Sequence, residues 1–190
     1  MKTPLVTAVL QRQQLPDTIR NNLYGPPRSQ WREHPYYLIS DARALQRNHN
    51  GLKRQARQYH GALTYLMSLN EADRQSHHHQ QLLGTVIHHG QALLKHLHSH
   101  HGFEDSSVFP VLRLHHPRLE KAISLLENDH LALDSLLQQI GNGLRDTQGL
   151  SRDARILAQA HHQAGQLETL LQRHMDDEEE IIVPVYLQQM

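Results

Sequence analysis

The sequence predicts an all-α protein: an up-down-up-down four-helix bundle that follows an irregular N-terminal arm. Apolar residues recur at steps of three and four through most of the chain, which is the spacing of a buried helix face. A motif of histidine, glutamate and proline also occurs twice at a fixed offset, which indicates a duplicated two-helix unit. We therefore assign residues 1–39 to the arm and residues 40–190 to the bundle.

The N-terminal arm is predicted to be irregular because it is rich in proline and has no sustained apolar period. It contains five of the eight prolines, including the adjacent Pro26 and Pro27. We expect the aromatic side chains of Trp31, Tyr36 and Tyr37 to attach the arm to the bundle or to a second subunit, which would make the protein a homodimer.

Four helices are expected after the arm. Their approximate bounds are residues 40–70, 76–108, 117–147 and 151–182. Ser40 is a suitable N-cap for the first helix, because its hydroxyl can accept a hydrogen bond from the first turn. Pro110 and Pro184 are expected to end or kink the second and fourth helices, because proline has no backbone N–H to donate.

Each predicted helix places a histidine on its apolar face. In the third helix, leucine and isoleucine recur at steps of four and three on both sides of His130, and a similar pattern surrounds His49 in the first. The inward stripes of the second and fourth helices contain His100 and His174. Taken singly, such a histidine is more often an ordinary core residue than a ligand. Four of them on facing stripes indicate a shared site.

The second and fourth helices also share a longer motif at an offset of 74 residues. The matching positions are His100/His174, Glu104/Glu178, Asp105/Glu179, Phe109/Val183 and Pro110/Pro184. With 18 histidines and 9 glutamates, roughly one His-x-x-x-Glu pair is expected by chance. A third pair, His116 to Glu120, has no second copy and fits that expectation. Residues four apart share a helix face, so each repeated copy directs an imidazole and a carboxylate at the same point.

These side chains predict a metal site. Burying four imidazoles and two carboxylates without partners would cost several kcal/mol, whereas shared cations would neutralise the acids and bind the ring nitrogens. The chain contains no cysteine, which excludes disulfides, thiolate zinc sites and iron–sulfur clusters. The predicted metal ligands are His49, His100, Glu104, His130, His174 and Glu178.

Two histidines of the first helix, His49 and His60, lie on its inward stripe. Eleven residues separate them, roughly 16 Å along a helix, so both cannot reach one site. If facing residues of two antiparallel helices lie equally far from the turn, His49 opposite His100 also pairs Tyr59 with Gly90 and gives only apolar or small neighbours. The register with His60 opposite His100 would place polar residues in the core. We therefore select His49 and keep His60 as the alternative.

Other histidines are expected to have different roles. His60, His89 and His162 fall at one height in the predicted bundle, where we expect a partly hydrated imidazole layer, with a second, weaker metal site as the alternative. No acidic residue on the inward stripes accompanies them. The three histidines at residues 77–79 are expected to form an exposed run between the first two helices.

From about Asp41 to Tyr186 the chain resembles the hemerythrin-like, HHE cation-binding domains. The resemblance rests on an inward histidine in the first and third helices and on the pattern His-x-x-x-Glu-(Asp/Glu)-x-x-x-(Phe/Val)-Pro in the second and fourth. It implies a four-helix up-down bundle around a non-haem di-iron centre bridged by two glutamates. The ligands it implies are His49, His100, Glu104, His130, His174 and Glu178.

The chain also departs from two kinds of protein within this resemblance. Oxygen-carrying hemerythrins place two histidines one turn apart on the third helix, whereas here His130 is followed four residues later by Asp134. The bacterial di-iron proteins linked to repair of iron centres after nitrosative stress share the His-x-x-x-Glu arrangement. Those proteins have a cysteine-containing N-terminal segment, and this chain has no cysteine.

The resemblance implies two iron ions, with manganese or zinc as alternatives, joined by an oxo or hydroxo bridge. Counting ligands leaves about one open position per metal, where O₂, peroxide or NO would bind. We therefore expect a protein that binds, senses or turns over a small oxidant. The alternatives are an iron-handling protein without turnover, an iron-centre repair protein and a structural metal bundle. The sequence does not decide whether the protein is an enzyme.

Charge and hydropathy give expectations about partners and location. Lys plus Arg and Asp plus Glu balance at 19 each, which gives no electrostatic case for nucleic acid or an anionic membrane as a partner. No apolar run approaches the roughly 20 residues that a spanning helix needs. The first residues show no small-residue cleavage site of a signal peptide, so we expect a cytoplasmic protein.

Overall fold

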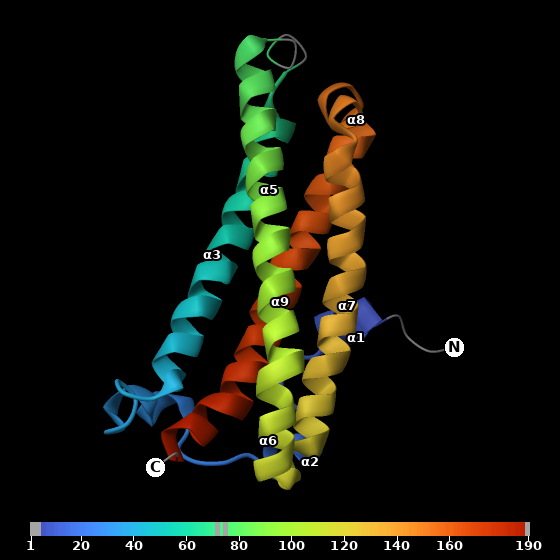
Figure 1. Ribbon diagram of the computed structural model, residues 1–190. Coiled ribbons are helices and arrows are strands. Elements are labelled where there is room, and N and C mark those ends of the chain that lie inside the picture. The colour runs from blue at the N-terminus through green and yellow to red at the C-terminus, as the bar shows by residue number, and fades with distance from the viewer. Residues whose placement is uncertain (1–4, 71–72, 74–75, 189–190) are drawn as a thin grey trace.

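The computed structural model describes residues 5–70, 73 and 76–188. No strand occurs in these residues, and the prediction of an all-α protein is confirmed. Four long helices lie side by side (Figure 1). They are α3 (Asp41–Ser68), α5 (His77–Phe103), α7 (Glu120–Arg145) and α9 (Ala154–Gln188).

Each long helix contacts two others. α3 packs against α5 and α9, and α7 packs against the same two helices. The colours of Figure 1 show that the chain runs in opposite directions along consecutive long helices. The inward faces of all four helices therefore border one interior.

The register of α3 on α5 agrees with the predicted pairing of Tyr59 with Gly90. A Cβ atom on Gly90 would lie 2.8 Å from Cε2 of Tyr59 and 2.8 Å from Cδ1 of Leu144. A glycine at this point therefore lets the buried tyrosine ring and the α7 leucine approach the backbone of α5.

The apolar core is divided into two main clusters along the length of the helices. On α7, Ile123 and Leu126 belong to one cluster, and Leu133 and Leu137 belong to the other. The buried His130 lies between them on the same helix. The core therefore contains a layer in which polar side chains take the place of leucine and isoleucine.

The second predicted helix is divided into consecutive helical segments that together extend past its expected end. After α5 the chain forms a π-helical segment, η2 (Glu104–Val108), and then α6 (Phe109–His115), in which Pro110 is in the first turn. The fourth helix also continues past its proline: α9 runs through Pro184, which is buried together with its neighbours. Neither proline ends its helix, because the burial of the surrounding apolar residues offsets the lost hydrogen bond. The alternative expectation, a kink, stays a prediction.

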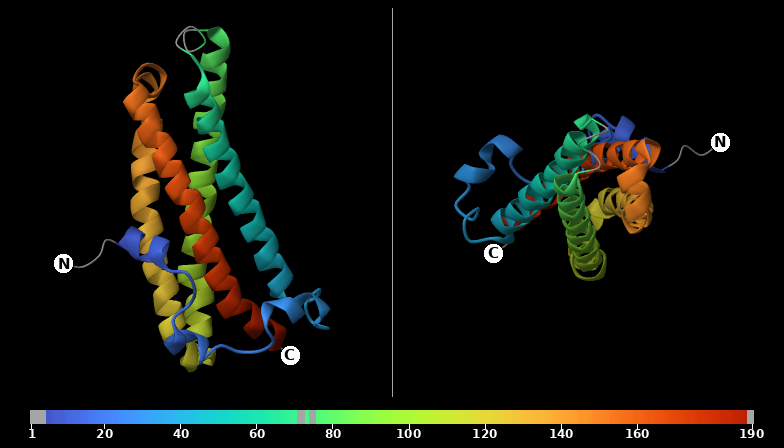
Figure 2. Two further views of the ribbon diagram at one scale, coloured as in Figure 1. Left: turned by 180° about the vertical axis from the view of Figure 1, so that it is seen from behind. Right: turned by 90° about the horizontal axis from the view of Figure 1, so that it is seen from above.

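The N-terminal arm is more regular than predicted. It contains α1 (Leu5–Gln11), α2 (Asp17–Arg20) and the 3-10 helix η1 (Arg28–Glu33). Figure 2 shows it passing from the side of α7, around one end of the long helices, to the start of α3. Trp31 packs against bundle residues and donates its indole N–H to the carbonyl of Pro26 at 2.9 Å. The hydroxyl of Tyr37 lies 2.7 Å from Oε1 of Gln46 on α3.

Short elements connect the long helices. The 3-10 helix η3 (Pro117–Leu119) precedes α7, and α8 (Thr147–Arg152) precedes α9. At the start of α5 the Ser76 hydroxyl accepts a hydrogen bond from the backbone N–H of His79 at 3.1 Å. His77 and His78 are exposed but His79 is buried, so the predicted exposed run is wrong at its last member.

No helix within the described residues is long and apolar enough to cross a membrane.

Candidate metal centre

Seven histidine and glutamate side chains meet in the polar layer of the core, and each residue is at most 8% exposed. The six predicted ligands are all among them. The seventh residue is His101, the neighbour of His100 on α5. By element, the residues are His49 on α3, His100 and His101 on α5, Glu104 at the start of η2, His130 on α7, and His174 and Glu178 on α9.

The seven side chains form two groups, and within each group one ligand atom from every residue lies within 4.8 Å of the others. The first group is His49, His100, Glu104 and Glu178, and the second is His101, His130 and His174. In the second group Nε2 of His130 lies 3.2 Å from Nε2 of His174. Each group has the size and the donor atoms that one cation requires.

The two glutamates lie between the groups. Oε1 of Glu104 is 3.1 Å from Nε2 of His100 in the first group, and its Oε2 is 3.5 Å from Nε2 of His130 in the second. Oε2 of Glu178 is 3.3 Å from Nε2 of His49 and 3.7 Å from Nε2 of His174. Each carboxylate therefore faces histidines of both groups.

A second set of carboxylates faces the outer nitrogens of three histidines. The Nδ1 contacts are His49 with Glu179 at 3.2 Å, His130 with Asp105 at 2.8 Å and His174 with Asp129 at 3.5 Å. For His49 and His130 the contact is a hydrogen bond, which fixes the tautomer and ring orientation and leaves Nε2 to bind a cation. For His174 it is an ion-pair contact without a hydrogen bond. The acidic position that follows each glutamate of the duplicated motif thus supports a histidine on a neighbouring helix.

Burial and neighbouring charges shift the protonation of the cluster. Burial lowers the pKa of His100 to about 4 and the pKa of His101 well below its usual value. Burial raises the pKa of Glu104, and the carboxylate of Glu178 raises it further. Burial alone would lower the pKa of His49, but the carboxylates that face it outweigh this effect and raise the pKa to about 9. At neutral pH the rings of His100 and His101 are therefore unprotonated and available as ligands.

The donor set could hold metal cations. Several buried atoms of the cluster have no hydrogen-bond partner among the described residues: both carboxylate oxygens of Glu104 and Glu178, Nε2 of His49 and His100, and both ring nitrogens of His101. An unpaired buried polar atom costs about 1–3 kcal/mol, and more if it is charged. In the metal-free fold protonated His49 offsets the charge of Glu178. Cations would bind the remaining atoms and neutralise both glutamates.

A comparison with protein families agrees with this geometry. Residues 40–186 match the model described as the hemerythrin HHE cation binding domain. The chain belongs to this family. Comparisons with curated proteins and with solved structures found no match.

His101 is not among the six ligands predicted from the sequence of this hemerythrin domain. That prediction assumes one inward stripe per helix, and His101 lies beside the stripe that contains His100. Adjacent helical residues point about 100° apart, but α5 contacts both α3 and α7. The ring of His100 therefore contacts His49 on α3, while the ring of His101 stacks on His130 of α7 with 4.2 Å between centroids. In the sequence, the adjacency of His100 and His101 is the signal that one helix can direct histidines at two neighbouring helices.

The π-helical segment η2 is a second feature of the hemerythrin domain that the sequence does not reveal. It begins at Glu104, within the cluster, and a π turn holds one more residue than an α turn. Asp105, its second residue, contacts Nδ1 of His130 on α7. π turns occur frequently at functional sites, and this one lies where the second helix contributes its carboxylates.

The alternative first-helix residue, His60, lies outside both groups. Its Nδ1 is 2.8 Å from Oε2 of Glu168 on α9, and its ring is 4.7 Å from that of His161 between centroids. The predicted layer is wrong, because His89 and His162 are exposed and an acidic residue pairs with His60. The sequence prediction omits Glu168 because that residue lies beside the inward stripe of the fourth helix.

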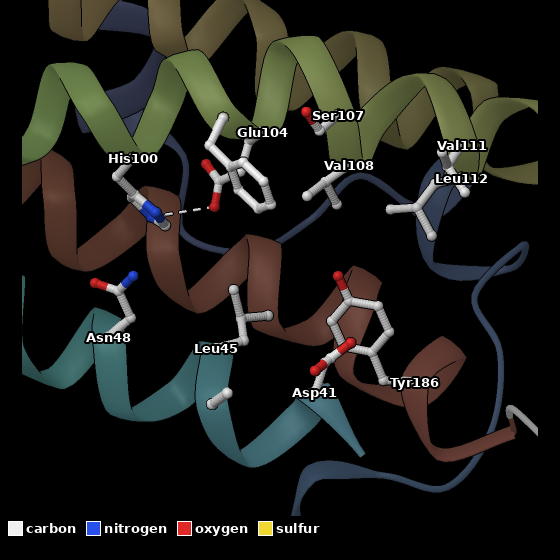
Figure 3. Close-up of a pocket in the computed structure, with 12 residues that line it drawn as sticks. Asp41, Leu45, Asn48, His100, Glu104, Ser107, Val108, Val111, Leu112 and Tyr186 are labelled. Carbon is white, nitrogen blue, oxygen red and sulfur yellow. Dashed lines mark ion pairs between the residues drawn. The ribbon is translucent and has the colours of Figure 1, made fainter.

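A cavity of about 450 Å³ reaches the first group of the hemerythrin centre. Figure 3 shows His100 and Glu104 above it, with Asn48 and Leu45 on α3 and Tyr186 near the end of α9 on its other walls. Burial raises the pKa of Tyr186 to about 12, with nearby carboxylates contributing. The phenol therefore keeps its proton at physiological pH and can donate a hydrogen bond.

Proposed function

We propose that this hemerythrin-family protein holds two iron ions in an up-down-up-down four-helix bundle and that it binds, senses or turns over a small oxidant: O₂, peroxide or NO. One observation supports this most directly: Glu104 and Glu178 each face two groups of histidines, one group for each ion. When bound, such ions supply redox chemistry and a coordination position for a small ligand.

The ligand count makes the two proposed metal positions unequal. Two metals with about six positions each offer about twelve. Five imidazoles, two bridging carboxylates and one oxo or hydroxo bridge would occupy all but about one of them. His101 thus reduces the count from the two open positions that the sequence suggests. The remaining position belongs to the first group, where His49 and His100 supply one imidazole fewer than the second group does.

The cavity supports this assignment because it borders the first group. His100 and Glu104 line it, whereas the three histidines of the second group do not. Leu45 and Val108 give it apolar walls that suit a small, weakly hydrated ligand. The protonated phenol of Tyr186 is the nearby donor that would hydrogen-bond to such a ligand.

The donor chemistry supports iron over other metals. Imidazole with carboxylate suits iron and manganese, and a structural zinc ion would be satisfied by four ligands. Manganese or zinc remains able to occupy the same residues. Glu104 and Glu178 would neutralise part of the charge, and the carboxylates at the outer nitrogens of three histidines would offset more of it as the oxidation state changes.

The test is an optical spectrum of the iron-loaded protein, reduced and then exposed in turn to O₂, peroxide and NO. We expect about two iron ions per chain and a charge-transfer band that responds to at least one of these oxidants. A protein that binds iron but shows no such band would be an iron-handling protein without oxidant chemistry. A protein that binds no metal would contradict the proposal as a whole.

A further inference from the structure

Arg12, at the end of α1 in the N-terminal arm, lies between two buried carboxylates of the bundle. Its guanidinium donates two hydrogen bonds to Asp129 on α7, one of them with 3.1 Å from Nη1 to Oδ1, and its Nε donates to Oδ2 of Asp177 on α9 at 2.7 Å. The Arg12 side chain is 13% exposed, and those of Asp129 and Asp177 are 3% and 0% exposed. This contact is an electrostatic anchor of the arm on α7 and α9.

Apolar burial and a backbone contact hold the same part of the arm. Val9 and Leu15, on either side of Arg12, are buried in the two core clusters. Arg173 on α9 also pairs with Asp177 and donates a hydrogen bond to the backbone carbonyl of Gln13 at 2.8 Å. The arm is therefore packed against α7 and α9 at the level of the polar layer.

Asp129 connects this anchor to the metal centre. Its Oδ2 lies 3.5 Å from Nδ1 of His174, a member of the second group, and the next residue in the chain is His130. A carboxylate held between an arginine and an imidazole has less freedom to turn away from the ring. Arg12 thus acts on His174 through Asp129 without touching any of the seven clustered side chains.

The position that corresponds to Asp129 in the other half of the duplicated fold has no carboxylate. Asp129 precedes His130 as Asn48 precedes His49, so Asn48 is the corresponding residue of the first helix. Asn48 is exposed, neutral and part of the wall of the cavity beside His100. The residue before His130 therefore binds the arm through Arg12, whereas the residue before His49 borders the cavity.

We propose that Arg12 is a positioning residue for the metal centre, so that docking of the arm and metal binding strengthen each other. The inference rests on the proposed metal centre. It concerns a residue outside the family match, which begins at residue 40. Because coupling between two binding events is reciprocal, metal in the centre must also favour the docked arm.

Arg28 is a second arginine of the arm whose removal can be compared with that of Arg12. It pairs with Glu179, whose other oxygen faces His49, but Gln46 and Lys53 also contact Glu179. Removing Arg28 leaves these other partners in place. We therefore expect a smaller effect from Arg28 than from Arg12.

The first experiment measures metal affinity by competition with a chelator, using Fe(II) without oxygen and Co(II) as an optical probe of histidine coordination. We expect Arg12→Ala to weaken binding by about ten- to a hundredfold and to alter the Co(II) spectrum. Arg12→Lys should recover part of the affinity, and Arg28→Ala should have a smaller effect than Arg12→Ala. The control is Arg20→Ala, because among the described residues the Arg20 side chain hydrogen-bonds to Gln14 and Asp17 of the arm itself.

The second experiment uses the unaltered protein, so it decides the question even if Arg12→Ala does not fold. Hydrogen exchange of residues 8–15 is compared with and without bound metal, and α8 serves as the reference segment for global stabilisation. We expect metal to slow exchange in the arm more than in α8. Unchanged exchange in the arm, or a folded Arg12→Ala variant with unaltered metal affinity, would overturn the inference. Failure of the unaltered protein to bind metal would overturn the proposed centre and this coupling together.

Discussion

At the scale of single residues, His101 makes the two halves of the centre unequal. It adds a third imidazole to the second group and stacks on His130. We predict that His101→Ala weakens metal binding by about tenfold or more, because a buried ligand is lost. The exposed His98 on the same helix supplies the control, since His98→Ala removes an imidazole without touching the cluster. Metal per chain and affinity are the measurements, and equal affinities for the two variants would remove His101 from the ligand set.

The pKa of His49 gives the centre a pH dependence. Because the pKa rises from about 6.5 to about 9 in the metal-free fold, protonated His49 stabilises that fold below pH 6.5, and this contribution is lost as the pH rises through 9. Metal binding at Nε2 must displace the proton, so affinity should fall as the pH drops below about 9, by about tenfold per pH unit for each displaced proton.

Titration calorimetry of the same reaction in buffers of different ionisation enthalpy counts the released protons. We expect about one or more per chain at pH 7. His100 should contribute none there, because its pKa of about 4 leaves it unprotonated. Metal binding without proton release at pH 7 would show that His49 is not protonated in the metal-free fold.

At this scale the sequence predicts contacts between residues that are close together in one helix. His100 with Glu104 and His174 with Glu178 are visible because four residues in a helix make one face. His49 was selected over His60 by register, and the structure places only His49 in the cluster. Glu168 beside His60 and Asp129 beside His174 were not foreseen, because neither contact follows from the spacing within one helix.

At the scale of the elements, the packing of α5 depends on a glycine. Alanine at Gly90 would place Cβ 2.8 Å from the ring of Tyr59, which is buried and has little room to move. We expect Gly90→Ala to lower the free energy of unfolding by about 1–3 kcal/mol through overpacking, a larger effect than the roughly 1 kcal/mol gained in helix propensity.

Gly84 on the same helix is the matched control, since nothing lies within 4 Å of a Cβ built there. Gly84→Ala should raise the free energy of unfolding by up to about 1 kcal/mol. Urea denaturation of the metal-free proteins measures both variants. The predicted register of α3 on α5 would be contradicted if both substitutions stabilised the protein equally.

The helix boundaries were the least predictable property at this scale. Pro110 and Pro184 favour an end or a kink, yet α6 and α9 extend beyond them. The π segment at Glu104 places Pro110 in the first turn of a new α-helix. Local propensity is a weak signal compared with the burial of the residues on both sides, such as Phe109 and Val183.

At the scale of the whole molecule, the metal centre should contribute to the stability of the fold. A ligand that binds only the native state raises the free energy of unfolding by about 2.7 kcal/mol when its free concentration is 100 times the dissociation constant. We therefore expect chelation to lower the midpoint of thermal unfolding and iron to restore it. Magnesium, which prefers oxygen ligands, is the control and should not restore it. An unchanged midpoint after complete iron removal would contradict this role.

The sequence alone determined the parts of this protein that depend on periodicity. Apolar residues at steps of three and four predicted the helices. The motif repeated at an offset of 74 residues identified four of the clustered side chains. Only the tertiary structure decided what depends on residues far apart in the chain. These features are the second imidazole of α5, the carboxylates that face the outer histidine nitrogens, the cavity beside His100 and the anchoring of Arg12. The physical reason is that a helix period fixes which residues share a face, whereas the neighbours of that face are set by packing.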